Sequence, residues 1–232
     1  MTVDRIKMNF IKKLLNTGYI SGEHIPTSLI PVMKQARALG LVELDEMHNY
    51  IKVLDRVGLV LTLLEKRLLP TEELTLLLDW REYEELCRRI LEAFDFTTRR
   101  NLRFKFQSRL MELDVVGIRG RDVLVLECKR WSTRFGREAR LRREVVEFRR
   151  KVELFVEWLR KNAYRLFNIR GKVELIIVPV LVTIWNGKTL VFEGIPLVPL
   201  HRLRSFIDEY TNYLDSLAHY TVNTESPQCS LL

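Results

Sequence analysis

Charged side chains interrupt two adjacent apolar strands predicted between residues 109 and 131, and this feature constrains what the chain can fold into. Successive side chains of a strand alternate between its two faces, so Glu127 and Lys129 of the second strand share one face. Asp114 interrupts the first strand. The turn at residues 119–122 is short enough to make the two strands antiparallel neighbours. Two carboxylates and an ammonium are therefore expected together at one edge of a hydrophobic sheet.

Burying such charges is costly unless they meet one another or a metal ion. The simplest interpretation is a structural ion pair, in which Lys129 neutralises Asp114 or Glu127. The spacing Asp-x12-Glu-x-Lys, however, resembles the core motif of the PD-(D/E)XK nuclease superfamily. That resemblance implies that Asp114, Glu127 and the backbone carbonyl of Cys128 bind Mg²⁺ (or Mn²⁺). It also implies that Lys129 helps to activate water or stabilises the transition state of phosphodiester hydrolysis.

The composition excludes several classes of protein. The chain has 232 residues, 47% hydrophobic and 29% charged, as in a globular protein of one or two domains. Its apolar runs are shorter than the ~20 residues that span a bilayer, so no membrane association is expected. Three widely spaced cysteines exclude a disulfide framework, and four scattered histidines argue against zinc. The scarcity of cysteine fits a reducing, cytoplasmic interior, and a net charge of +8 favours a polyanionic partner such as nucleic acid.

Residues 1–70 are predicted to form a separate small domain. An apolar helical stripe is followed by two shorter helices, one around residues 22–29 and one from Pro31. Two short strands then surround a polar tip, and Asp55 is expected to cap a helix that runs to Leu69. This order of elements resembles a winged-helix domain.

The role of this first domain stays open. In winged helices the third helix commonly enters the major groove of DNA. Here that helix offers only Lys34, Gln35 and Arg37 as polar contacts, and the acidic tip at residues 45–48 suits phosphate badly. The sequence is therefore compatible with DNA binding and equally with protein interaction, including formation of a homodimer.

Residues 71–220 are predicted to form the second domain. Asp79 and Glu82 have the spacing of a capping box at the start of a helix. The phrase YEELCRRILEAF, followed by a basic strand, resembles the first helix of archaeal and Mrr-like members of the nuclease superfamily. The resemblance implies that Glu84 adds a carboxylate to the metal site. The alternative is that Glu84 is an ordinary surface residue of a helix.

A strongly basic stretch follows the motif strand and continues into a long amphipathic helix. Cations with few acidic neighbours suit a phosphate backbone. Lys151 comes from a further resemblance, of VVEFRRKVELF to the helix that follows the Glu-x-Lys strand in archaeal members, and it could face the site. The residues expected to contact nucleic acid are Arg130, Arg134, Arg137, Arg140 and Lys151. A solvated surface is the alternative for all of them.

The expected fold is α/β (α+β), a winged helix-turn-helix domain followed by a restriction-endonuclease-like core with a central mixed sheet flanked by helices. Residues 221–232 are expected to be a disordered tail. The implied function is metal-dependent hydrolysis of phosphodiester bonds of DNA. Three alternatives stay open: a nucleic-acid-binding winged-helix regulator with an inactive nuclease fold, a Holliday-junction-type resolvase that requires a dimer, and a scaffold that binds an acidic partner.

Overall fold

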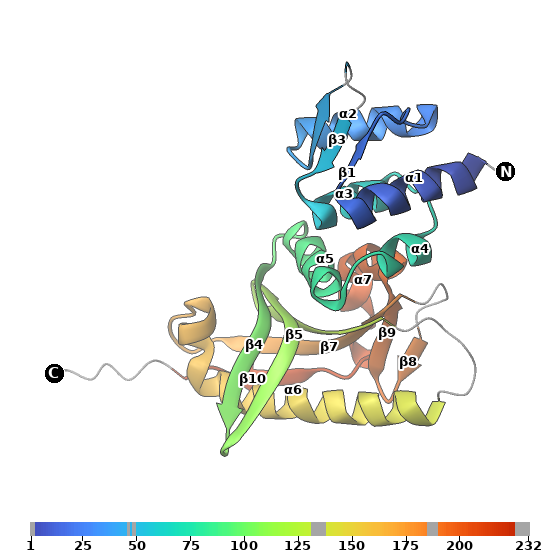
Figure 1. The fold of residues 1–232 in the computed structure, drawn as a ribbon. Coiled ribbons are helices and arrows are strands. Elements are labelled where there is room, and N and C mark those ends of the chain that lie inside the picture. The colour runs from blue at the N-terminus through green and yellow to red at the C-terminus, as the bar shows by residue number, and fades with distance from the viewer. Residues whose placement is uncertain (1–2, 46, 48–49, 131–137, 185–189, 226–232) are drawn as a thin grey trace. The chain divides into compact units, whose positions relative to one another are not determined.

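The structure, a computed structural model, describes residues 3–45, 47, 50–130, 138–184 and 190–225 (Figure 1). The chain divides into two compact units, Met1–Leu86 and Cys87–Leu232. The first holds a small sheet with helices, and the second holds a mixed sheet with helices. The α/β class expected from the sequence is confirmed.

The N-terminal unit alternates helices with three short strands. Its elements in chain order are α1 (Val3–Thr17), β1 (Tyr19–Ser21), the 3₁₀ turn η1 (Thr27–Leu29), α2 (Ile30–Ala38), β2 (Val42–Asp45), β3 (Tyr50–Val53), α3 (Arg56–Glu65) and α4 (Thr71–Leu76). The strands form an antiparallel sheet in the order β1-β3-β2. This order follows the one predicted for residues 1–70 except that β1 is added and η1 stands in place of the second helix.

Local sequence signals explain most of these elements and three departures from the prediction. Asp55 caps α3 as expected, because its carboxylate accepts from Gly58 N at 3.0 Å. The helix expected around residues 22–29 is only the turn η1. β1 was not predicted, since three residues carry little local signal and it exists by pairing with β3. α3 ends at Glu65 rather than Leu69, just before Arg67 adopts the left-handed conformation with φ of 50°.

Helix α5 (Trp80–Glu92) begins with the predicted capping box. Glu82 N donates to Asp79 Oδ1 at 2.8 Å, and Asp79 N donates to Glu82 Oε2 at 2.8 Å. Arg56 of α3 also donates to Glu82, at 2.7 Å, which ties the start of α5 to the N-terminal unit. The two compact units meet within α5, between Leu86 and Cys87. The sequence predicted a domain boundary near residue 70 instead.

The C-terminal unit is built on a seven-stranded mixed sheet. Its elements are β4 (Thr97–Phe106), β5 (Arg109–Arg119), β6 (Asp122–Lys129), α6 (Glu138–Phe167), β7 (Glu174–Thr183), β8 (Leu190–Phe192), β9 (Ile195–Pro199), η2 (Leu200–Arg202), α7 (Leu203–Glu209), η3 (Tyr210–Ser216) and β10 (Tyr220–Asn223). β4, β5 and β6 form an antiparallel meander, and the predicted turn between β5 and β6 contains Gly120 with φ of 61°. The long helix α6 then returns the chain to β7, which pairs parallel to β6.

Helix α6 covers one face of this sheet and closes the main core of the unit (Figure 1). Its apolar stripe keeps helical spacing, as the sequence predicted. The buried members of that stripe are Val145, Phe148, Val152, Phe155 and Leu159. They pack with strand residues such as Val123, Val125 and Ile177. The position of α6 is therefore fixed by apolar packing, which matters for the polar residues at its N-terminal end.

The end of the chain differs from the prediction. β9 pairs parallel to β7, and β8 pairs antiparallel to β9 at the edge of the described sheet. The disordered tail was expected to begin at residue 221, yet β10 pairs antiparallel with β7 and Val222 is buried. The polar residues around Val222 hid a strand whose stability comes from that pairing. Residues 226–232 lie outside the described part of the chain. Among the described residues, no helix has the length and apolar character needed to cross a membrane.

Candidate functional site

The candidate site lies where β5 and β6 part from one another. Regular pairing of these strands ends at Val115 and Leu126, although β6 continues to Lys129. Beyond that point the Asp114 carboxylate, rather than a backbone carbonyl, accepts from Cys128 N, at 2.7 Å. The Asp114 side chain thus takes the place of the next backbone hydrogen bond between the two strands. Asp114 and Glu127 are the next residues after the last pair on the two strands, and they are close enough for the charge of Glu127 to act on Asp114, as the sequence predicted.

Strand pairing on the other side of Asp114 is interrupted as well. β4 and β5 pair on both sides of this point, but Asn101 and Asp114 do not pair, and Asn101 has a left-handed φ of 51°. The N–H and C=O of one strand residue point to the same side of the strand. Because Cys128 N–H points at Asp114, the Cys128 carbonyl also points to the edge that Asp114 occupies. The resemblance to the nuclease superfamily implies that the Cys128 carbonyl is a metal ligand at this same edge.

Two lysines from different elements hold Glu127. Lys151 of α6 donates to both carboxylate oxygens of Glu127, at 3.1 and 3.3 Å. Lys129 Nζ lies 3.0 Å from Glu127 Oε1 and 3.0 Å from Glu144 Oε2. The Glu127 side chain is only 5% exposed, so these contacts occur in a poorly hydrated place. A chain of charges therefore runs Lys151–Glu127–Lys129–Glu144, with Asp114 beside it.

The protonation of the site follows from burial and from the neighbouring charges. Burial and the charge of Glu127 raise the pKa of Asp114 from 3.8 to about 6, although the Cys128 N–H, Lys151 and Lys129 act in the opposite direction. Burial alone would lower the pKa of Lys129, but the carboxylates of Glu127 and Glu144 outweigh it and raise that pKa above its ordinary value. The Asp114 carboxyl group therefore ionises less readily than an ordinary aspartate, and Lys129 holds its proton more firmly than an ordinary lysine.

The donor atoms gathered here are of the type that binds a hard divalent cation. Carboxylate and carbonyl oxygens are the ligands that Mg²⁺ prefers. Two adjacent, poorly hydrated carboxylates, one with a raised pKa, gain most from an added positive charge. The described residues contain no group of three or more His, Cys, Asp or Glu side chains that could hold a metal. A cation here would therefore rest on two carboxylates, backbone carbonyl oxygen and water.

Glu84 is not part of this described group. It lies in α5 within the Met1–Leu86 unit, whereas Asp114 and Glu127 belong to the Cys87–Leu232 unit. Its side chain is buried, with 5% of the residue exposed, so the alternative of an ordinary surface carboxylate is wrong. Its participation at the site stays a prediction.

The predicted phosphate contacts fall into three groups. Lys151 is brought to the site, as its contact with Glu127 shows. Arg130 follows β6 directly and is partly buried. Arg134 and Arg137, and the side chain of Arg140 at the start of α6, lie outside the described part of the structure.

Glu144 is the site residue that the sequence analysis missed. A signal for it was available, because Glu144 and Lys151 are seven residues apart on one helix. Seven residues make nearly two helical turns, so both side chains lie along one face. Only Lys151 was predicted to face the site. Glu144 lies on the same helix face and contacts Lys129.

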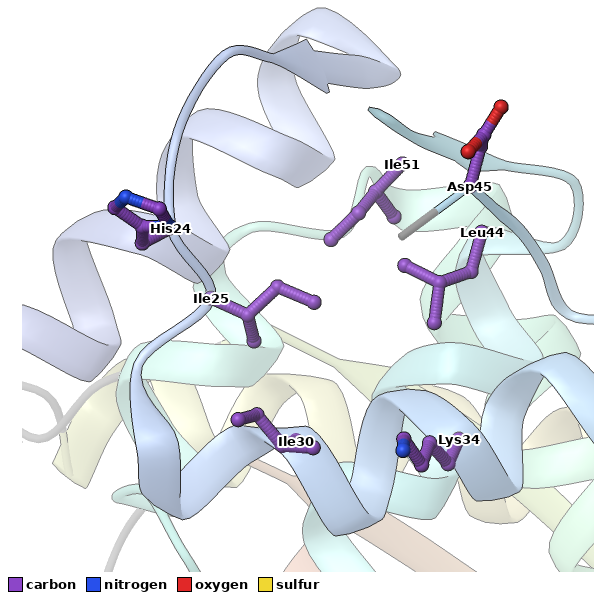
Figure 2. Close-up of a pocket in the computed structure, with 7 residues that line it drawn as sticks. All are labelled: His24, Ile25, Ile30, Lys34, Leu44, Asp45 and Ile51. Atoms are coloured by element: carbon purple, nitrogen blue, oxygen red, sulfur yellow. The ribbon is translucent and has the colours of Figure 1, made fainter. Parts of the chain in front are cut away.

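A separate pocket of about 270 Å³ lies in the N-terminal unit, between the loop after β1, α2 and the β2–β3 strands (Figure 2). Four of its lining side chains are apolar and three are polar. The lining residues are His24, Ile25, Ile30, Lys34, Leu44, Asp45 and Ile51. None of the predicted catalytic or metal-binding residues lines it.

Comparison with known proteins gives one relative by sequence and several distant structures. No family model matches the chain. An uncharacterized protein of Archaeoglobus fulgidus is 33% identical over 135 residues, which cover 58% of this chain and 94% of the archaeal protein. The chain belongs to the family of this archaeal protein. Because this relative is itself uncharacterized, the family membership brings no activity to the chain.

The solved structures are more remote. Protein VC1899 from Vibrio cholerae is 11% identical with a TM-score of 0.42, over 92% of this chain and 52% of VC1899. The protein of unknown function AF1548 is 16% identical with a TM-score of 0.27, over 43% of this chain and 44% of that protein. Can2 from Sulfobacillus thermosulfidooxidans, solved with cyclic tetra-adenylate, is 11% identical with a TM-score of 0.30, over 79% of this chain and 43% of Can2. The chain thus spans about half the length of these proteins or less.

Proposed function

We propose that this protein is a metal-dependent nuclease of the PD-(D/E)XK type that hydrolyses phosphodiester bonds of DNA in the cytoplasm. The observation that supports it best is the parting of β5 from β6, which puts the Asp114 and Glu127 carboxylates side by side next to the Lys129 ammonium. Purely structural ion pairs do not need two adjacent carboxylates, because the second one raises the cost of burial. Such a pair is useful when a cation is to be bound.

Asp114, Glu127 and the Cys128 carbonyl would hold Mg²⁺ or Mn²⁺, and Glu84 is a further predicted contributor. A bound divalent cation would supply polarisation of the phosphate and a lower pKa for attacking water. The protein's own part is to align both carboxylates. The Cys128 N–H holds the Asp114 carboxylate and favours its ionised form, and Lys151 holds the Glu127 carboxylate.

The surroundings of Lys129 support an electrostatic role for this residue. Glu127 and Glu144 raise its pKa against the effect of burial, which favours the protonated form of the side chain over the free amine that a general base requires. An ammonium beside the metal-binding pair can neutralise charge that develops on the phosphate oxygens. Of the two roles that the sequence left open for Lys129, stabilisation of the transition state is the one we propose.

A second candidate is a nucleic-acid-binding protein with an inactive site. The observation that favours it is that two ammonium groups, those of Lys129 and Lys151, lie 3.0 and 3.1 Å from Glu127 Oε1. In such a cluster the two lysines balance the charges of Glu127 and Glu144, and its role would be purely structural. A dimeric resolvase is a special case of the nuclease proposal and differs in acting only on branched DNA.

One experiment separates these functions. The full chain is incubated with duplex, single-stranded and branched DNA and with RNA, with Mg²⁺, with Mn²⁺ and with a chelator. We expect metal-dependent cleavage of DNA, and Asp114→Asn or Glu127→Gln should lower the rate by at least ~100-fold because the charge that binds the cation is lost. Glu112→Gln, on the same strand as Asp114, is the matched control and should cleave at the wild-type rate. A wild-type protein that binds DNA but cleaves nothing in either metal would favour the inactive-site function.

A further inference from the structure

Glu144 is a carboxylate of α6 to which the proposed chemistry gives no task. Its Oε2 lies 3.0 Å from Lys129 Nζ, and the same ammonium lies 3.0 Å from Glu127 Oε1. The side chains of Glu144 and Lys129 are 27% and 25% exposed. Lys129 therefore bridges a deeply buried carboxylate of the sheet and a partly buried carboxylate of the helix.

The contact between Glu144 and Lys129 is not needed to hold α6 on the sheet. The helix is already fixed by its buried apolar stripe, including Val145, Phe148 and Val152. A partly exposed ion pair adds little to stability in comparison with such side chains. Holding two long side chains in one geometry also has an entropic cost. The arrangement is therefore better explained by what it does to Lys129.

The other groups around Lys129 cannot replace Glu144. Lys151, on the same face of α6, is itself a cation and binds Glu127. Asp114 of β5 accepts from Cys128 N, and Thr183, which pairs with Lys129 on β7, is uncharged. Glu127 is the only other carboxylate within 4 Å of the Lys129 ammonium among the described residues. A divalent cation on Glu127 would weaken that contact, because it takes up the carboxylate charge and repels the ammonium.

We propose that Glu144 is a positioning residue for Lys129: it holds the ammonium beside the Asp114–Glu127 pair when Glu127 is engaged by a divalent cation. The inference rests on the proposed nuclease function. It adds a second residue of α6, besides Lys151, to a site whose other described residues lie on β5 and β6. It also explains why Glu144 and Lys151 share one face of α6, since each holds one charged residue of β6.

Glu144→Gln in the full chain is the test, with Glu147→Gln as the matched control, because Glu147 is an exposed glutamate of the same helix. Cleavage rates are measured against pH with Mg²⁺. Loss of a residue that orients a reacting group typically lowers activity ~10–100-fold, so we expect that fall in kcat with KM changed by less than about threefold. The alkaline limb of the pH profile should also move to lower pH. Glu147→Gln should behave as the wild type.

A second readout does not depend on cleavage. Amine-labelling of Lys129 at pH 9, followed by mass spectrometry, reports the fraction of unprotonated amine. Glu144→Gln should label Lys129 about tenfold faster or more, since each pKa unit lost raises the free amine tenfold. Glu144→Asp should give an intermediate rate, and it also serves if the glutamine variant unfolds.

The results of the two readouts distinguish two failures. A wild-type chain that cleaves nothing overturns the proposed function, while faster labelling in Glu144→Gln would still support the hold on Lys129. Unchanged labelling in both Glu144 variants overturns the inference, even if the wild-type chain is an active nuclease. So does an unchanged kcat and alkaline limb in Glu144→Gln, which would make Glu144 an ordinary partly exposed ion-pair partner.

Discussion

Asp114 is a carboxylate whose surroundings oppose its own charge. Burial and the neighbouring Glu127 raise its pKa to about 6, well above the ordinary 3.8. The folded state then binds a proton more tightly than the unfolded state does. The stability that this group contributes is fully present below pH 4 and is lost as pH rises through 6. At neutral pH the protein therefore keeps a charge there at a cost in stability, as sites that bind cations often do.

Asp114→Asn should remove that cost. The amide oxygen can still accept from Cys128 N, and no charge is buried, so we expect the variant to be roughly 1–2 kcal/mol more stable than the wild type at pH 7.5. The difference should vanish towards pH 4. Mg²⁺ should raise the melting temperature of the wild type and not that of the variant. Thermal unfolding across pH, with and without Mg²⁺, measures both effects, and a variant less stable than the wild type at pH 7.5 would contradict this account of Asp114.

At the scale of elements, signals carried by neighbouring residues placed several caps and turns correctly. The capping box of Asp79 and Glu82, the cap at Asp55 and the turn containing Gly120 were all predicted from residues a few positions apart, and all are confirmed. Elements that depend on distant pairing were not. β1 and β10 are short, polar at alternate positions and stabilised by β3 and β7 respectively, so the local sequence shows little of them.

The residues of the candidate site show the same contrast between local signals and distant contacts. Asp114, Glu127 and Lys129 were predicted together because a tight turn fixes the register of β5 and β6. The contact of Lys129 with Glu144 could not be, because it requires knowing which turn of α6 passes the end of β6. That position is set by apolar side chains far along the helix. Whether Asp114 and Glu127 bind metal stays a prediction.

Gly117 tests how tightly the strand that carries Asp114 is packed. A Cβ at this position would lie 3.0 Å from Leu91 Cδ1 and 3.3 Å from Phe96 Cβ, both in the same compact unit. Because buried neighbours have little room to move, Gly117→Ala should destabilise the protein by about 1–3 kcal/mol in urea unfolding. Gly120→Asn is the control, since this turn position has open space and asparagine tolerates its φ of 61°. Equal stabilities of the two variants would show that β5 moves freely.

At the scale of the whole molecule, the site and the N-terminal sheet belong to different compact units. The charges of the site, from Asp114 to Lys151, all lie within Cys87–Leu232. The helix α5 nevertheless runs without a break across the division. Cutting at residue 87 would leave only six residues of that helix, too few to stay helical in isolation. The start of the second domain predicted from the sequence, near Pro70, keeps α5 whole.

A truncated protein that begins at Pro70 should therefore fold and bind Mg²⁺ as the full chain does, because it keeps every strand of the larger sheet and all of α6. Metal binding is measured by calorimetry, and folding by cooperative thermal unfolding. If the N-terminal unit contacts DNA, truncation should raise the Kd for duplex while leaving metal affinity unchanged. If it instead forms a dimer, sedimentation should show a full-length dimer and a truncated monomer, and paired cuts across both strands should disappear. A folded but metal-free truncated protein would contradict both outcomes, and it would mean that residues before Pro70 complete the catalytic site.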